Sequence, residues 1–281
     1  MFDFFGAIAE NPFLRAALFA GIAAAIVGGV VGAYVVIKRI VFISGSIAHS
    51  VLGGIGFCLW LQRAQGVLWA KPIYGALVAA LISAWIMGWI HLKYREREDT
   101  VIAAVWSIGM AVGVLFISQT PGFNVELANF LVGNILWTSW SDLYILLSID
   151  ALVIAVVFCF RKCFLTICFD EDQAYLQGLS VPFFYLLLLT LIAVTVVLLI
   201  HVVGIILVIT LLTIPPTLAN LSSHRLSHIM ILAVFIGVGI TFVGTLISYQ
   251  LNTPAGATIA LLAGLFYLFR LVLKRSKYLQ K

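Results

Sequence analysis

The stretch IVFISGSIAHSVLGGIGFCLW, residues 40–60, has the length and apolarity of a helix that crosses a membrane. A single histidine, His49, lies near its middle among serines and glycines. An imidazole in hydrocarbon loses its hydration, so it is expected to face a protein interior or a watery pathway, where it carries a proton or binds a metal ion. Ser46, Ser50 and Gly54 follow one another at intervals of four and allow close approach of another helix or a hydrated substrate. This helix is therefore the first place to look for a pathway.

The composition of the whole chain extends this interpretation to all 281 residues. Of these, 63% are hydrophobic and only 10% are charged, whereas a soluble domain has about 25% charged residues. The mean hydropathy is +1.17. The basic residues lie mainly at the ends of apolar runs, so the net charge of +5 is better explained as a topology signal than as a nucleic-acid-binding surface. The sequence predicts an all-α polytopic membrane protein in which residues 1–281 form a single transmembrane domain.

Apolar segments of spanning length recur along the chain. They cover residues 13–37, 40–61, 73–92, 101–119, 143–160, 182–200, 203–221, 228–249 and 255–273. A shorter apolar piece, Leu127 to Trp137, is typical of a re-entrant or partial helix. We expect a bundle of about eight or nine crossing helices, and at most about ten.

The distribution of Lys and Arg predicts the orientation. If the spans alternate, most basic residues fall on one side, which is then the cytoplasm, with the N-terminus outside and the C-terminus inside. The exceptions on the opposite side are Arg63 and Lys71. The basic residues on the cytoplasmic side are Lys38, Arg39, Lys93, Arg95, Arg97, Arg161, Lys162, Arg225, Lys274, Arg275, Lys277 and Lys281.

One predicted cytoplasmic segment, FDEDQAYLQGLSVP at residues 169–182, is acidic rather than basic. Asp170, Glu171 and Asp172 favour the N-terminal end of a short helix, and Gly178 suits its C-terminal stop. Two interpretations remain open from these residues: a short helix that projects into a cytoplasmic partner, or a solvated loop that joins two spans.

Five segments in order resemble the membrane-spanning permease subunits of the bacterial ABC importers for zinc, manganese and iron. The resemblance covers nearly the whole chain. The segments are the His49 helix, SQTPGFNVELANFLVGNIL (118–136), the acidic segment at Asp170, VVGIILVITLLTIPPTLANL (202–221) and SYQLNTPAGATIALLAG (248–264).

The resemblance implies an ABC importer permease fold in the bacterial cytoplasmic membrane and a defined set of partners. These are membrane lipid, a second permease chain, identical or not, a cytoplasmic ATP-binding subunit and an extracytoplasmic metal-binding protein. It also implies that the acidic segment is the coupling helix, which docks in a groove of the ATPase. The coupling residues are then Asp170, Glu171, Asp172, Gln173, Ala174, Tyr175, Leu176, Gln177 and Gly178.

The sequence has no G-x-x-x-x-G-K-[ST] phosphate loop, so ATP is expected to act through the partner subunit and the chain is not itself an enzyme. No permanently bound cofactor is expected, since the divalent cation is the transported substrate.

His49 is the candidate metal-transit residue. In relatives of the family, an aspartate four residues before this histidine completes a nitrogen and oxygen pair suited to a divalent first-row metal. Here that position is Gly45. Two further positions that are often acidic in the family are Asn134 and Asn252. The alternative for His49 is a histidine hydrogen-bonded to a neighbouring helix for packing alone.

Other features carry weaker expectations. His224 and His228 stand four apart and are expected to share one helix face, either as an exit site for the ion or as interfacial decoration. Pro215 and Pro216 are expected to break or kink the run that contains them. The four cysteines form no CxxC pair, which argues against a metal or redox role.

Two competing function classes fit the sequence less well. A secondary transporter would need intramembrane carboxylates for ion coupling and two similar halves, whereas the spans are nearly free of Asp and Glu and show no internal repeat. A membrane enzyme would need a pattern such as HExxH or GxSxG, and neither is present.

Overall fold

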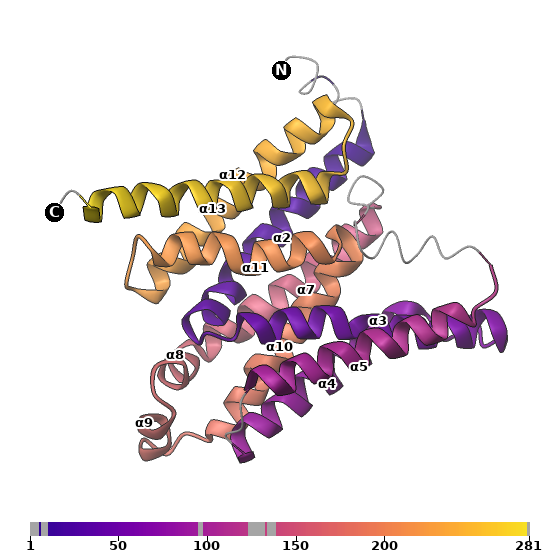
Figure 1. Ribbon diagram of the computed structural model, residues 1–281, viewed down its shortest axis with the longest axis horizontal. Helices are drawn as coiled ribbons and strands as arrows, with labels where there is room; N and C mark the ends of the chain where they lie inside the picture. The colour runs from indigo at the N-terminus through magenta and orange to yellow at the C-terminus, as the bar shows by residue number, and fades with distance from the viewer. Residues whose placement is uncertain (1–5, 7–10, 95–97, 123–132, 134–138, 280–281) are drawn as a thin grey trace. The chain divides into compact units, whose positions relative to one another are not determined.

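The computed structural model describes residues 6, 11–94, 98–122, 133 and 139–279, and every regular element among them is helical (Figure 1). The helices of the first half are α2 (Pro12–Ile37), α3 (Val41–Ala64), α4 (Pro72–Tyr94), α5 (Glu98–Ser118) and α7 (Trp140–Cys159). Those of the second half are α8 (Arg161–Phe169), α9 (Glu171–Leu176), α10 (Val181–Val203), α11 (Ile205–Asn220), α12 (Leu226–Leu251) and α13 (Ala255–Leu279).

Within the described residues, eight helices are long and apolar enough to cross a membrane, namely α2, α3, α4, α5, α7, α10, α12 and α13. Helix α11 is apolar but has only 16 residues. The predicted apolar segments thus all form helices, with ends shifted by a few residues. The predicted partial helix from Leu127 to Trp137 lies outside the described residues. The polytopic all-α fold is confirmed.

The chain forms two compact units, each built from separate stretches of sequence. The first contains Met1–Ala33, Leu131–Asp150 and Val202–Lys281, and therefore most of α2 with α11, α12 and α13. The second contains Tyr34–Phe130 and Ala151–His201, and therefore α3, α4, α5, α8, α9 and nearly all of α10.

In the first unit, glycines of α2 let it pack tightly against α11 and α12. A Cβ atom added at Gly29 would lie 2.8 Å from the Cγ2 atom of Val234, and one at Gly32 would lie 2.8 Å from the Cγ atom of Pro216. Real Cβ atoms essentially never approach this closely. Helix α2 therefore makes a close crossing through Gly29 and Gly32 in this unit.

The expected break or kink at Pro215 and Pro216 is not a break, because α11 continues through both residues to Asn220. The physical reason is that Gly32 of α2 has no side chain. It leaves room for the ring of Pro216 and for the carbonyl of Leu212, which a larger residue on α2 would push away. Neighbouring helices commonly accommodate proline inside a membrane helix in this way.

In the second unit, α3 packs against both α4 and α5, and backbone meets backbone in each contact. Toward α4, the closest approach joins Gly54 and Gly75. Toward α5, a Cβ atom at Gly56 would lie 2.6 Å from the carbonyl oxygen of Gly113, and one at Gly109 would lie 2.5 Å from the Cα atom of Ser50. Small residues at four-residue spacing thus hold the His49 helix rigidly between two neighbours.

Candidate functional site

His49 lies in the middle of α3 and its side chain is half-buried. Its ring stacks on the indole of Trp106 from α5, with ring centroids 4.2 Å apart and planes inclined by 9°. The Trp106 Nε1–H in turn donates to the Met110 sulfur at 2.9 Å. The imidazole is therefore held in one plane by an aromatic neighbour that is itself positioned.

Stacking uses the face of the imidazole and leaves its edge, where both nitrogens lie, uncommitted. Among the described residues, no hydrogen bond reaches either ring nitrogen of His49. The alternative of a histidine tied to a neighbouring helix by a hydrogen bond is thus not what the described part of the chain contains. The ring presents one nitrogen lone pair, which is what a first-row metal ion requires of a histidine ligand.

The nearby serines serve packing instead. The Ser46 hydroxyl donates to the Ile102 carbonyl of α5 at 3.0 Å, and the Ser50 hydroxyl donates to the Ile47 carbonyl at 2.9 Å. Both serines are buried. The Gly45 position is open, since a Cβ atom there would have nothing within 4 Å.

The described residues contain no group of three or more His, Cys, Asp or Glu that could hold a metal ion. A single imidazole binds a cation weakly and releases it readily, because stable sites have four or more ligands. Among the described residues, His49 is therefore not part of such a group.

The acidic segment folds as predicted, into a short helix with defined ends. The Asp170 carboxylate caps α9 by accepting from the backbone N–H of Asp172 at 2.9 Å and of Gln173 at 3.0 Å. Gly178 follows the helix with φ of 77°, a left-handed conformation that glycine adopts without strain. Toward its end the helix exposes two large side chains, Tyr175 at 74% and Leu176 at 84%.

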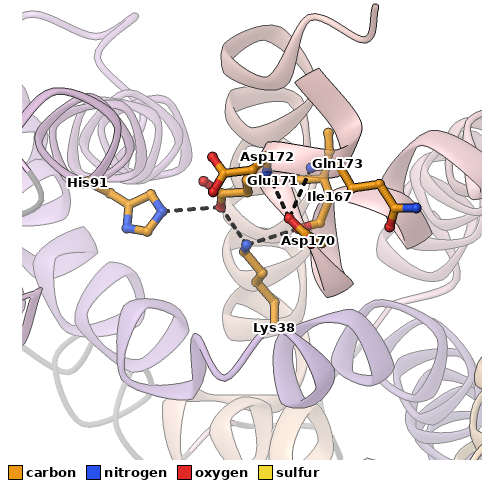
Figure 2. A network of polar contacts seen from close by, with 7 residues as sticks. All are labelled: Lys38, His91, Ile167, Asp170, Glu171, Asp172 and Gln173. Carbon is orange, nitrogen blue, oxygen red and sulfur yellow. Dashed lines mark hydrogen bonds and ion pairs between the residues drawn. The ribbon is translucent and has the colours of Figure 1, made fainter. Parts of the chain in front are cut away.

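Glu171 connects the beginning of α9 to other segments of the second unit. As Figure 2 shows, the Glu171 carboxylate lies between Lys38 and His91. The Lys38 Nζ atom donates to Glu171 Oε1 at 2.5 Å, and His91 Nε2 lies 3.3 Å from the same oxygen. Hydrogen bonds from His91 and Lys38 lower the pKa of the Glu171 carboxyl from 4.5 to about 2, against the opposing effect of burial.

The remaining residues singled out from the sequence are Asn252, Asn134, His224 and His228. Asn252 forms the C-terminal cap of α12 with φ of 52°, a left-handed conformation that asparagine tolerates well, so a structural reason accounts for the amide. Asn134 lies outside the described residues. The expectation that His224 and His228 share a helix face was wrong, because α12 begins at Leu226 and leaves His224 in the preceding bend.

The described cysteines are free thiols, and two of them, Cys58 and Cys168, are buried. Burial raises the pKa of the Cys168 thiol to about 12, although the charge of Lys38 opposes this. A thiol with so high a pKa is a poor nucleophile and metal ligand.

The sequence argument passed over Asp150, which lies within α7 and is only 5% exposed. Neither of its carboxylate oxygens has a hydrogen-bond partner among the described residues. The available signal was a lone carboxylate inside a predicted span, which marks a functional candidate in a membrane protein. Sequence reasoning also treated Lys38 as a topology signal and assigned no role to His91.

Comparison with known proteins places these features in a family. Residues 10–274 match the ABC 3 transport family. The chain belongs to this family. Within it, the "Probable metal transport system membrane protein" of Chlamydia muridarum (strain MoPn / Nigg) is 47% identical, over 94% of this chain and 90% of its own length. The "Chelated iron transport system membrane protein YfeD" of Yersinia pestis is 31% identical, over 95% of this chain and 87% of its own length.

A solved structure agrees with the ABC 3 assignment. The structure titled "PsaBC from Streptococcus pneumoniae in complex with Fab" superposes with a TM-score of 0.83 at 28% identity, covering 95% of this chain and 94% of that chain. The predicted family, the permease fold and the multi-pass membrane location are thereby confirmed.

Proposed function

We propose that this ABC 3 protein is the membrane-spanning permease subunit of an ATP-driven importer of divalent metal cations, with zinc, manganese and iron as the candidate cargoes. The observation that carries the proposal is the imidazole of His49, held in mid-span by stacking on Trp106 with its nitrogen edge uncommitted. The names of the relatives, which include metal transport and chelated iron transport, support the substrate class.

The partners follow from this role. The sequence lacks a phosphate loop, so a separate cytoplasmic subunit hydrolyses ATP. An extracytoplasmic binding protein delivers the cation, and a second permease chain, identical or not, completes the pathway in the bacterial cytoplasmic membrane. The cation is substrate, and no resident cofactor takes part.

The transport cycle runs by alternating access. The cation enters at the outer mouth, passes His49, exchanges one water ligand for the imidazole nitrogen, and leaves toward the cytoplasm. Because Gly45 supplies no carboxylate, the contact is weak, which favours release over retention. Closure of the ATPase acts on α9, where exposed Tyr175 and Leu176 supply the docking surface.

The orientation required by this cycle has support from three separate segments. Lys38 follows α2, His91 lies in the last turn of α4, and Glu171 begins α9, and the three side chains meet at one end of the second unit. Each belongs to a segment that the basic-residue pattern assigns to the cytoplasm. Their meeting is what a common cytoplasmic side for all three requires.

The test is metal uptake in cells that express the complete transporter, with zinc, manganese and iron each traced. The informative pair of variants is His49→Ala and His49→Phe, since phenylalanine keeps the stacking surface against Trp106 but has no nitrogen. If His49 contacts the ion, uptake of one metal falls by about tenfold or more in both variants. This is the usual effect of losing a metal ligand or a group that orients one. Full activity of His49→Phe would reduce His49 to packing.

The buried carboxylate of Asp150 favours the competing function, a secondary transporter. The same uptake assay separates the two functions when it is run in membrane vesicles with an ionophore that collapses ion gradients. ATP-dependent uptake that survives the ionophore supports the importer. Uptake that needs the gradient and no ATP supports the secondary transporter.

A further inference from the structure

Glu171 joins α9 to two other parts of the second unit through one carboxylate oxygen (Figure 2). We call Lys38, His91 and Glu171 the Glu171 clamp. Lys38 lies in the turn between α2 and α3, and its Nζ atom also donates to the Ile167 carbonyl of α8 at 3.0 Å. His91 approaches from the last turn of α4. The clamp thus fixes the start of α9 to the elements that lead into α3 and out of α4.

A second layer supports the clamp. The ring of His91 stacks on Tyr185 of α10 with centroids 4.7 Å apart, and the Lys38 ammonium lies 5.7 Å from the centroid of the same ring. Tyr185 is fully buried. Both partners of Glu171 therefore also contact one buried aromatic side chain.

The partial burial of the clamp distinguishes it from an ordinary surface ion pair. The side chains of Lys38, His91 and Glu171 are 13%, 20% and 30% exposed. Exposed pairs contribute little because water and salt screen them, whereas charge-assisted hydrogen bonds away from solvent are about twice as strong as neutral ones. The carboxylate stays ionised under all physiological conditions, because its pKa lies at about 2.

Two chain segments connect the clamp to the His49 helix, namely the turn after Lys38 and helix α4. After Lys38, Arg39 adopts φ of 63°, a left-handed conformation that is rare outside glycine, and α3 begins at Val41. His49 lies eight residues farther along α3, about 12 Å at the rise of an α-helix. On the other side, α4 meets α3 backbone to backbone at Gly75 and Gly54. Two routes thus lead from the clamp to α3, one through the turn at Arg39 and one along α4 from His91 to Gly75.

We propose that Glu171 is a positioning residue that transmits movement of α9 to α3 and α4 through Lys38 and His91. Breaking the clamp then uncouples ATP hydrolysis from transport while the ATPase remains bound at Tyr175 and Leu176. This inference rests on the proposed function, since it names the permease residues through which coupling passes.

The experiment uses the complete transporter, reconstituted in vesicles with its ATPase and binding protein, and measures ATP hydrolysed per metal ion taken up. The variants are Glu171→Gln and Lys38→Met. The matched control is Asp99→Asn, which removes one negative charge from an exposed position of the second unit that lies outside α9. We expect the two clamp variants to raise the ratio by about tenfold, the effect of losing one charge-assisted hydrogen bond, and the control to stay within about twofold of the intact protein.

A charge exchange separates transmission from folding. In Lys38→Glu with Glu171→Lys, the ion pair is restored in reverse, so we expect the ratio to recover at least in part if the contact itself transmits the movement. An unchanged ratio in Glu171→Gln overturns the proposal. It is also overturned if the clamp variants lose the bound ATPase and the charge exchange does not restore it, because the clamp is then only a scaffold.

The proposed function fails by a different result. If the intact transporter takes up none of the three metals in an ATP-dependent manner, the substrate class or the energy source is wrong. The comparison of Glu171→Gln with Asp99→Asn still reports on the clamp through the ATPase rate that the permease stimulates.

Discussion

Substitution of Gly54 by alanine should destabilise the second unit more than the addition of one methyl group suggests. A Cβ atom at this position of α3 would lie 2.8 Å from the Cβ atom of Ala79 and closer still to the carbonyl of Gly75, whereas ordinary contact begins at 3.4 Å. The nearest atoms are backbone, so no side-chain rotation relieves the overlap. The helices α3 and α4 must separate, and overpacking of this kind costs about 1–3 kcal/mol.

A matched control lies on the same helix. At Gly45, a Cβ atom would have nothing within 4 Å, so Gly45→Ala should gain about 0.5–1 kcal/mol from the better helix propensity of alanine. Gly54→Ala receives the same gain, and its net loss is therefore about 0–2.5 kcal/mol. The two variants should differ by about 1–3 kcal/mol in the free energy of unfolding, although each adds only one methyl group.

The assay is thermal unfolding of the purified permease in detergent, followed with a thiol-reactive fluorescent dye. Cys58 and Cys168 are buried and become reactive on unfolding, whereas exposed Cys159 reacts at once and sets the baseline. We expect the melting temperature of Gly54→Ala to fall below that of Gly45→Ala by about 2–10 °C. Equal melting temperatures, or a higher value for Gly54→Ala, would refute the close crossing of α3 and α4.

Three further predictions concern charged groups and the open position on α3. The pKa of Glu171 is lowered on folding from 4.5 to about 2, so its stabilising effect is complete above pH 4.5 and is lost as the pH falls toward 2. The melting-temperature difference between the intact protein and Glu171→Gln should therefore not shrink between about pH 7.5 and about 5, where protonation of His91 strengthens its pairing with the carboxylate, and should shrink below about 4.5. A difference that already shrinks at about pH 6 would contradict this. Asp150→Asn should raise the melting temperature, because an unpartnered buried carboxylate costs about 1–3 kcal/mol or more; a lower melting temperature would reveal a partner, and lost uptake in a stabilised variant would identify a function. Gly45→Asp should lower the metal concentration at half-maximal uptake, since the site has room for the side chain and a carboxylate one turn from His49 adds a second ligand; an unchanged concentration dependence would argue against transit at this level of α3.

Much of the helical framework could be predicted from the sequence, because hydropathy in a membrane protein is a local property. Every backbone polar group in lipid needs an internal partner, so a long apolar run has little choice but to form a helix. The ends of α9 were also predictable, since capping by Asp170 and termination at Gly178 depend on neighbouring residues only.

Two expectations depended on local sequence rules that other parts of the chain override. A break or a kink was expected at Pro215 and Pro216, but α11 continues through both residues, and Gly32, far away in the sequence, leaves space for Pro216. His224 and His228 were expected on one helix face, but the preceding bend delays the start of α12 to Leu226. Neither effect is visible in the residues immediately around these positions.

The sequence by itself determined that the chain is a helical membrane protein of this family, with a lone histidine in mid-span and an acidic helix between two spans. Only the tertiary structure decided what these residues touch. It stacks His49 on Trp106, and it pairs Lys38 with Glu171 across 133 positions of the chain. The physical reason is that lipid selects helices by composition within each segment, whereas side-chain partners depend on which helices pack together, and glycines at backbone crossings set that packing.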